Sequence, residues 1–340
     1  MYVARAVASI LRELDSEYAV VHSELEARLA ERGFTQSQDN IDPHHITTAL
    51  NQLIQAKRVL VVEHTTKGNH LVKTIQPANT YRRATNIASA TKRKRTLYGR
   101  YLGWAQGTSR HPQGLIGPAG EAAVRKAILA SAALQPAVSG AGEVPSILGL
   151  KLPGPLDSAG YMVPFTQKIP GQPVTLLFEV KNIRSWIYPQ SPELFQLLNK
   201  AVLLQQHRPE LPILPILVCR AAHKTAFYMA KQLGFIVIDM KRQFVGAVDE
   251  DSILEVSSEL HFTDLKAGSD PSIRVLDRLR KTLPSTCTEA AKNWRTTATD
   301  MELAAAITAL KSTAGGHAAR ARAMDELRAL AIERGHQGGW

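Results

Sequence analysis

Apolar residues in the first part of the chain recur at helical spacing in three stretches and then alternate as they do in strands. The first two helical stretches cover residues 3–14 and 25–30. The third begins at Asp42-Pro43, where the aspartate can cap free amides and the proline loses no needed donor. Strand-like residues then flank a turn-forming sequence at 65–69. This pattern predicts three helices followed by a hairpin.

Three helices and a hairpin follow one another in the order of a winged helix, so we predict a winged-helix domain over residues 1–78. In that architecture the third helix presents polar side chains that can contact base edges in a major groove. These are His44, His45, Thr47, Thr48, Asn51 and Gln52. The net charge of residues 1–80 is −1, so a protein-binding role for this domain stays open as the alternative.

The next segment, residues 79–118, contains eight basic and no acidic side chains, although the whole chain carries a net charge of +11. We predict a basic linker here that neutralises phosphates of a nucleic acid, with tyrosine and tryptophan side chains stacking on bases. The candidate contacts are Arg82, Arg83, Lys92, Arg93, Lys94 and Arg95. A solvated linker that keeps the protein soluble is the alternative.

Residues 119–245 alternate between amphipathic helices and short apolar strands, which predicts an α/β domain. Residues 174–178 are apolar at every position and lead into Glu179-Val180-Lys181. This pattern predicts a buried strand that ends in a carboxylate and an ammonium group. The other predicted elements are helices over 120–134, 193–205 and 223–233 and strands over 161–165, 213–219 and 235–239.

Asp157, Glu179 and Lys181 form the most informative combination in this domain. Alternate residues of a strand point to the same face, so Glu179 and Lys181 share one face. An aspartate from a neighbouring strand would then place two carboxylates near one cation. Mg²⁺ takes one or two carboxylates with water and phosphate oxygens, and it polarises the phosphate that is cleaved. The alternative is an exposed strand end with a weak ion pair.

This combination and the order of the surrounding elements resemble the PD-(D/E)xK nuclease superfamily, which has the restriction-endonuclease-like fold. Asp157 lies in Pro155-Leu156-Asp157, so the proline is one residue away from the usual pair, whereas Glu179 and Lys181 match the signature directly. The resemblance implies a mixed sheet flanked by helices and hydrolysis of phosphodiester bonds with Mg²⁺ or Mn²⁺. It implies that Asp157 and Glu179 bind the metal, that Lys181 positions water, and that Glu121 assists them or holds a second ion.

Other polar residues near the motif are candidates for the same site. The resemblance implies that a polar residue on the next helix completes it, and Gln196 and Lys200 are the candidates. Arg184 and Trp186 follow the strand end, where ligand contacts collect in α/β sheets. We expect them to contact a phosphate and a base, although Trp186 can equally pack beneath the following helix.

The final segment, residues 246–340, is predicted to be a helical region. Only two cysteines occur, and no apolar run reaches the roughly 18 residues of a membrane span. The first residues lack the features of a signal peptide. We therefore expect a cytoplasmic protein that does not bind a membrane.

Together these patterns predict a metal-dependent nuclease that acts on DNA, with RNA as a possible substrate. Its setting would be restriction, antiphage defence or processing of the DNA of a mobile element. The expected assembly is a homodimer or a subunit of a larger nucleoprotein complex. A catalytically inactive nucleic-acid-binding or assembly subunit with a nuclease-like fold is the first alternative, and a transcription regulator with an unrelated α/β domain is the second.

Overall fold

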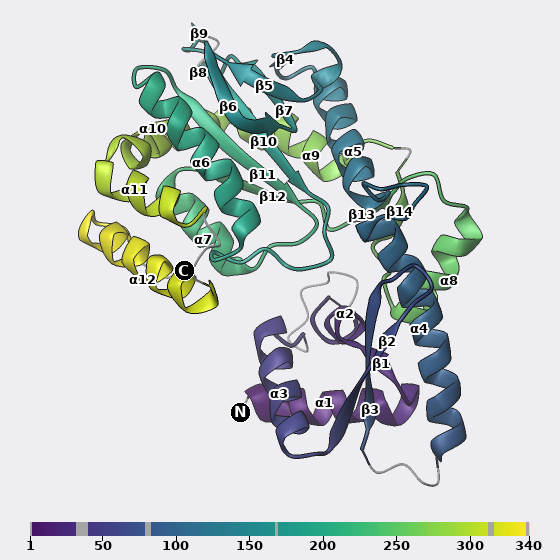
Figure 1. Ribbon diagram of the computed structural model, residues 1–340. Helices are drawn as coiled ribbons and strands as arrows, with labels where there is room; N and C mark the ends of the chain where they lie inside the picture. The colour runs from purple at the N-terminus through teal and green to yellow at the C-terminus, as the bar shows by residue number, and fades with distance from the viewer. Residues whose placement is uncertain are drawn as a thin grey trace. The chain divides into compact units, whose positions relative to one another are not determined.

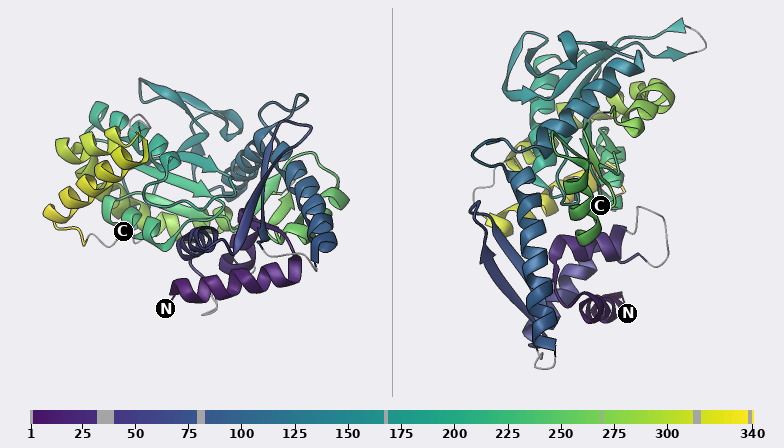
Figure 2. Two further views of the ribbon diagram at one scale, coloured as in Figure 1. Left: turned by 60° about the horizontal axis from the view of Figure 1, so that its bottom comes forward. Right: turned by 90° about the vertical axis from the view of Figure 1, so that its right-hand side faces the viewer.

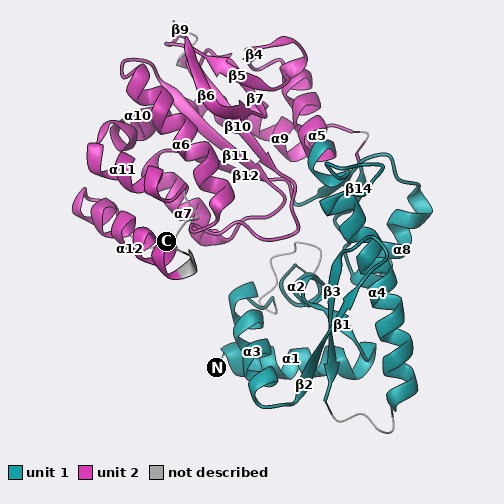
Figure 3. Ribbon diagram, in the orientation of Figure 1, with its two compact units in different colours: residues 1–118, 241–267 teal, residues 119–240, 268–340 magenta. Residues whose placement is uncertain are grey.

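The computed structural model describes residues 2–31, 40–78, 83–166, 169–268, 270–311, 316–337 and 340 of the chain. The protein is a mixed α/β protein with two compact units (Figure 3). The first unit contains Met1–Pro118 and Lys241–Ala267, and the second contains Ala119–Met240 and Gly268–Trp340. Residues 241–267 therefore return to the first unit, although we predicted that residues 246–340 form a single helical region.

The first unit begins with the predicted helices and hairpin, which are confirmed (Figure 1). The Asp42 carboxylate accepts the backbone N–H of His44 at 3.0 Å, so it caps the third helix as the sequence predicts. A short first strand, β1, was not predicted, and it completes an antiparallel sheet in the order β1-β3-β2. The elements are α1 (Tyr2–Glu17), β1 (Val20–Val21), α2 (His22–Glu26) with the π-helix Ala27–Glu31, α3 (Pro43–Gln55), β2 (Val59–Thr65) and β3 (Leu71–Pro77).

The expected basic linker is instead largely a helix of the first unit, α4 (Ala84–Gln106). Its tyrosine and tryptophan side chains lie in a hydrophobic core with residues of α8 (Glu250–Leu260) rather than in solvent. Tyr101 is buried and its hydroxyl donates to Gln243 at 3.1 Å, and Trp104 is also buried. Strands β13 (Gln243–Val245) and β14 (Leu265–Ala267) pair in parallel on either side of α8 in the sequence. Because these apolar groups are buried, the segment folds as a helix rather than remaining a solvated linker.

The second unit is built on a five-stranded mixed sheet with the strand order β12-β11-β10-β7-β4. Its central strand β10 (Val174–Lys181) pairs in parallel with β11 (Ile213–Cys219), which pairs in parallel with β12 (Ile236–Asp239). On its other side β10 pairs antiparallel with β7 (Ser158–Met162), which pairs with β4 (Gln135–Pro136). The strand expected at 161–165 thus begins at Ser158, directly after Asp157.

Helices cover the sheet and extend beyond it (Figure 1). Leu177, Leu217 and Val237 lie in one core cluster with residues of α6 (Pro192–His207) and α7 (Lys224–Leu233), so these helices cover that face. Gly234 ends α7 in the left-handed region, as expected of a helix stop. The other helices are α5 (Ile116–Ser131), α9 (Ile273–Asp277) with the π-helix Arg278–Thr282, α10 (Leu283–Thr299), α11 (Met301–Ala309) and α12 (Gly316–Glu333).

Two short strand pairs and one turn complete the second unit. Strand β5 (Val144–Ile147) pairs with β6 (Leu150–Leu156), and a 3₁₀ turn at Ser139–Ala141 precedes them. Strands β8 (Phe165–Thr166) and β9 (Ile169–Pro170) form a hairpin that projects from the unit (Figure 2). Among the described residues, none of the helices combines the length and apolar character that crossing a membrane requires.

Candidate active site

The candidate site lies where β7 begins and β10 ends. Because these strands are antiparallel, Ser158 at the start of β7 is paired with Phe178 near the end of β10. The Asp157 N–H donates to the Phe178 carbonyl at 3.1 Å, and the Asp157 carboxylate accepts the Val180 N–H at 2.6 Å. The structure therefore brings Asp157 beside Glu179 and Lys181, which belong to the last three residues of β10.

Glu179 is held between two lysine side chains. The Lys181 Nζ lies 2.8 Å from Glu179 Oε1, and the Lys200 Nζ lies 2.8 Å from Glu179 Oε2. Lys200 also donates to the carbonyl of Pro155 at 2.6 Å. The Glu179 side chain is only 6% exposed, so both contacts form in a largely dehydrated environment. Of the two candidates on α6, Lys200 reaches the site, whereas Gln196 is exposed.

Helix α5 brings a further carboxylate to the site. Arg125 donates to Glu121 Oε2 at 3.1 Å and to the Asp157 carbonyl at 3.2 Å, so it links Glu121 to the start of β7. A Cβ atom at Gly120 would lie 2.3 Å from the Cβ of Asn182, the residue after β10. Only a glycine permits this close approach of α5 to the strand end. The spacing of Glu121 and Arg125 was a sequence signal for their contact, since residues i and i+4 meet on a helix.

The carboxylates of the site influence one another electrostatically. Burial raises the pKa of Asp157, and the negative charge of Glu179 raises it further, although Val180, Lys181 and Lys200 act in the opposite direction. Burial also raises the pKa of Glu121, and the charge of Asp157 adds to this effect. Like charges near each other favour protonation, and a nearby cation favours ionisation. The site therefore holds the carboxylates Glu121, Asp157 and Glu179 together with the cations Arg125, Lys181 and Lys200. An additional cation near Asp157 would favour the ionised form of its carboxyl.

The donor set is compatible with Mg²⁺ or Mn²⁺. Within the described part of the chain, no group of three or more His, Cys, Asp and Glu side chains is arranged to hold a metal ion. Asp157 and Glu179 nevertheless offer hard carboxylate oxygens, and Mg²⁺ commonly uses one or two carboxylates and keeps several waters. The proximity of these two carboxylates at one strand end, where the charge of Glu179 raises the pKa of Asp157, is the observation that supports a cation here.

The loop after β10 differs from the expected ligand-contacting surface. Arg184, predicted to bind a phosphate, is buried with 8% exposure, and Trp186 is half-buried. Arg220, which was not predicted to be a functional residue, is fully buried and donates to the carbonyls of Ile183 and Arg184. The rings of Tyr188 and His223 stack with centroids 5.1 Å apart. This loop is therefore fixed by internal contacts, and Arg220 had no sequence signal because its partners are main-chain carbonyls.

The basic run on α4 is partly neutralised by carboxylates. The Lys94 side chain is fully buried, and its Nζ lies 2.7 Å from Glu24 and 2.9 Å from Glu259. Arg93 also pairs with Glu259, at 2.6 Å. The prediction that Lys94 contacts nucleic acid is therefore wrong, because a buried ammonium cannot reach a phosphate, and Arg93 already has a carboxylate partner.

The other predicted basic contacts have different surroundings. Lys92 and Arg95 are exposed, and no ion pair is seen for either among the described residues. Arg83 is half exposed and pairs with Asp15 at 2.9 Å. Arg82 lies outside the described residues. Lys92 and Arg95 are thus the members of the run that are available to a phosphate.

Helix α3 exposes most of the polar side chains that we predicted to contact base edges. Asn51 and Gln52 are exposed, and His45 and Thr48 are partly exposed. The His45 ring stacks on Tyr2 with centroids 5.6 Å apart, and the Thr48 hydroxyl donates to the carbonyl of His44 at 2.9 Å. Asn51 and Gln52 therefore remain the best candidates on this helix for contact with base edges.

Comparisons of the chain with protein-family models, curated proteins and solved structures found no match.

Proposed function

We propose that this protein is a metal-dependent nuclease that hydrolyses phosphodiester bonds, with DNA as the substrate. The observation that carries the proposal is the pairing of β7 with β10, which places Asp157 beside Glu179 and Lys181. Two carboxylates and an ammonium group at one strand end are the groups that metal-assisted phosphodiester hydrolysis uses. A strand end with a weak ion pair is a poorer account, because Glu179 is buried and two lysines contact it.

The arrangement of the sheet supports the same proposal. Helix α5, strands β7 and β10, helix α6, strand β11, helix α7 and strand β12 follow in the order expected of a restriction-endonuclease-like core. The three helices and the β1-β3-β2 sheet of the first unit have the order expected of a winged helix. A nuclease core together with a module of a kind that often binds DNA favours DNA over RNA as the substrate.

The roles of the residues follow from their contacts. Asp157 and Glu179 would hold Mg²⁺ or Mn²⁺, which supplies polarisation of the phosphate and activation of water when it is bound. The Lys181 ammonium orients a water molecule or offsets the charge that develops on the phosphate. Lys200 fixes the Glu179 carboxylate and the Pro155 carbonyl in their present positions. Arg125 does the same for Glu121.

A cleavage assay with matched variants tests the proposal. Supercoiled plasmid, linear duplex, single-stranded DNA and RNA are incubated with the full chain in Mg²⁺, Mn²⁺ or EDTA. We expect cleavage of DNA that requires the metal and that Asp157→Asn and Glu179→Gln abolish. Glu210→Gln, which changes an exposed carboxylate of the same unit, should cleave normally. Metal-independent cleavage, or full activity of Glu179→Gln, would refute the proposal. DNA binding without cleavage would favour the inactive subunit.

A further inference from the structure

Strand β12 forms an edge of the five-stranded sheet, with β11 as its neighbour on the inner side. The N–H of Met240, just after β12, donates to the carbonyl of Cys219 in β11 at 2.7 Å, so the main-chain N–H of Met240 points toward β11. The Asp239 carbonyl instead accepts Arg274 of α9 at 2.8 Å, so it points outward. Main-chain groups of successive strand residues point to opposite sides. The N–H and C=O of Val237 therefore point outward with those of Asp239.

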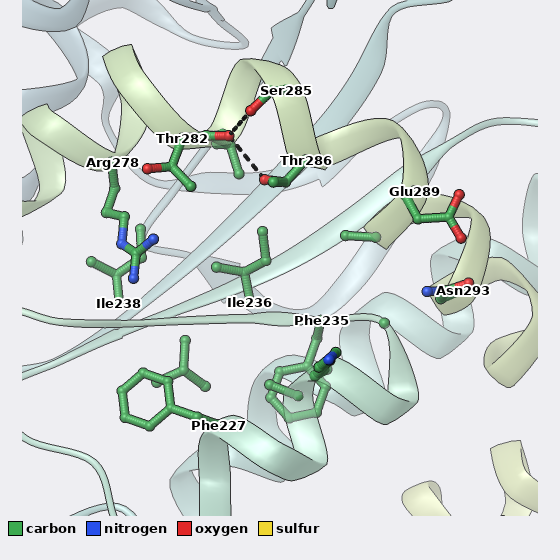
Figure 4. Close-up of a pocket in the computed structure, with 16 residues that line it drawn as sticks. Phe227, Phe235, Ile236, Ile238, Arg278, Thr282, Ser285, Thr286, Glu289 and Asn293 are labelled. Atoms are coloured by element: carbon green, nitrogen blue, oxygen red, sulfur yellow. Dashed lines mark hydrogen bonds between the residues drawn. The ribbon is translucent and has the colours of Figure 1, made fainter. Parts of the chain in front are cut away.

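Arg274 already occupies the outward carbonyl of Asp239, whereas Val237 is among the residues that line a groove with a volume of about 440 Å³. Residues 235–238 form one wall, and the π-helix after α9 together with α10 forms the other. Apolar side chains line much of the groove, among them Phe227, Phe235 and Ile236 (Figure 4). Near the start of β12 the helix α10 comes so close that a Cβ atom at Gly234 would meet the main chain of Trp294. The groove is thus a slot along the sheet edge, closed at one end by α10.

Some charged residues in and beside the groove have ion-pair partners among the described residues, and others do not. Arg274 pairs with Asp239, and Lys281 of the adjoining surface pairs with Asp277. Lys231 and Arg278 line the groove, are exposed, and show no ion pair with any residue in the described ranges. Glu289 is the acidic side chain of the lining, and it lies toward Asn293, whereas Arg278 lies beside Ile238 at the other end (Figure 4). The end at Arg278 therefore favours an anionic group.

We propose that this groove binds an extended segment of a partner protein, which adds to β12 as a further strand. The outward N–H and C=O of Val237 would form main-chain hydrogen bonds with the segment, which is how an extended peptide joins an exposed sheet edge. Apolar side chains of the segment would contact Phe227 and Ile236. An acidic side chain would pair with Arg278 or Lys231. This role is independent of the nuclease chemistry proposed above.

The walls of the groove argue against a second copy of this chain as the occupant. In a twofold-symmetric pairing of two β12 strands, the same surface faces itself. The β12 strand of a second copy would then have to enter the groove together with that copy's own wall of Arg278–Thr282 and α10. A small molecule would leave the outward main-chain groups of β12 without the regular partners that a strand supplies. An acidic, apolar strand of another protein satisfies both the edge and the cations.

Fluorescence anisotropy with the full chain tests this proposal. The probe is a fluorescein-labelled peptide of eight residues that alternate between valine and aspartate. We expect it to bind, and we expect Lys231→Glu with Arg278→Glu to weaken binding by at least about tenfold. Lys292→Glu reverses an exposed cation of α10 that does not line the groove, so this variant should bind normally. A peptide with lysine in place of aspartate should bind at least about tenfold more weakly.

A second change tests the main-chain contact itself. Val237→Pro removes the outward N–H and leaves the ladder to β11, because proline is tolerated on edge strands when its missing N–H faces outward. It should weaken binding, and circular dichroism reports whether it folds. A peptide N-methylated at alternate amides tests the same bonds on the unchanged protein, and it should not bind. Equal binding of the two charge forms of the peptide, or equal binding by the double charge variant, would overturn the proposal. Self-association that the charge variant abolishes would also overturn it, in favour of a second copy.

Discussion

Replacing Lys200 with methionine tests how the buried Glu179 carboxylate is stabilised. The side chain of Lys200 is 10% exposed, and its ammonium bonds both Glu179 and the Pro155 carbonyl. Removing one partner of a buried ion pair costs about 3–5 kcal/mol when the remaining charge is left uncompensated. Here Lys181 still contacts Glu179, which lowers the cost. The Pro155 carbonyl loses a hydrogen bond to a charged donor, worth about 1.5–3 kcal/mol. We therefore expect Lys200→Met to lower the free energy of unfolding by about 2–3 kcal/mol.

The corresponding change at Lys181 should affect stability less and cleavage more than the change at Lys200. The Lys181 side chain is 19% exposed, and it bonds only one oxygen of Glu179 in the contacts described above. Lys181→Met should therefore lower the free energy of unfolding by about 1 kcal/mol. It should nevertheless abolish cleavage, because Lys181 is the ammonium group that we assign to the reacting water and phosphate. Lys200→Met should retain measurable cleavage at temperatures where it is folded.

Urea unfolding followed by circular dichroism at pH 7, together with plasmid cleavage, separates the two lysines. A double-mutant cycle isolates the ionic contribution. In a Glu179→Gln background the charge of Glu179 no longer needs compensation by Lys200, so Lys200→Met should cost at least about 1 kcal/mol less than in the native chain. Lys224→Met, at an exposed position on α7, should change stability by no more than about 0.5 kcal/mol. Additive effects in the cycle, or a larger loss of stability for Lys181→Met than for Lys200→Met, would refute the reasoning.

Three other predictions concern groups outside the candidate active site. Lys92→Ala with Arg95→Ala should reduce the slope of log binding constant against log salt by up to about 1.8 on duplex DNA, at about 0.9 per phosphate. An unchanged slope would show that these exposed side chains do not contact phosphates. Asn51→Ala with Gln52→Ala should weaken discrimination between DNA sequences in competition binding, by about 1–3 kcal/mol for each base contact that is lost. Asp300→Asn should destabilise the protein by about 0.5–1 kcal/mol at pH 7. Burial opposes ionisation of Asp300, but capping amides and an arginine outweigh it and lower the pKa of the carboxyl. The stabilisation is present above the ordinary aspartate pKa and is lost as pH falls through the lowered value, so unfolding curves of Asp300→Asn and the native chain should converge in acid.

The predicted and observed elements agree best where burial is uniform. Strand β11 (Ile213–Cys219) has the bounds that the sequence predicts, because a short run that is apolar at every position is typical of an interior parallel strand. Helix α10 (Leu283–Thr299) lies within the region predicted to be helical, but its bounds were not predicted. Its sequence is rich in threonine, which has a low helix propensity, and proline occupies its second position. Cys287, Ala291 and Trp294 are buried at helical spacing, so tertiary packing determines this helix.

The candidate site was predictable to the extent that it depends on strand geometry. Alternation along a strand placed Glu179 and Lys181 on one face, and the structure brings Asp157 beside them. The contact of Lys200 with the Pro155 carbonyl requires the three-dimensional path of β6 beside α6, which no local pattern encodes. Arg220 is a similar case, because it bonds main-chain carbonyls 36 and 37 positions away. Contacts between charged side chains and distant main-chain groups leave no periodic signal in a sequence.

Helix α4 shows why a count of charges did not identify the groups that are free to bind DNA. The basic run contains four consecutive cations, and helical geometry distributes them around the helix rather than along one face. Lys94 consequently points into the first unit, where it meets Glu24 and the carboxylate and carbonyl of Glu259. Burial of the Glu24 carboxyl raises its pKa, and Lys94 offsets part of this effect. A buried ammonium needs such partners because its desolvation is costly. Lys94 therefore stabilises the fold, and the exposed neighbours Lys92 and Arg95 are the cations of this run that we propose to contact phosphate.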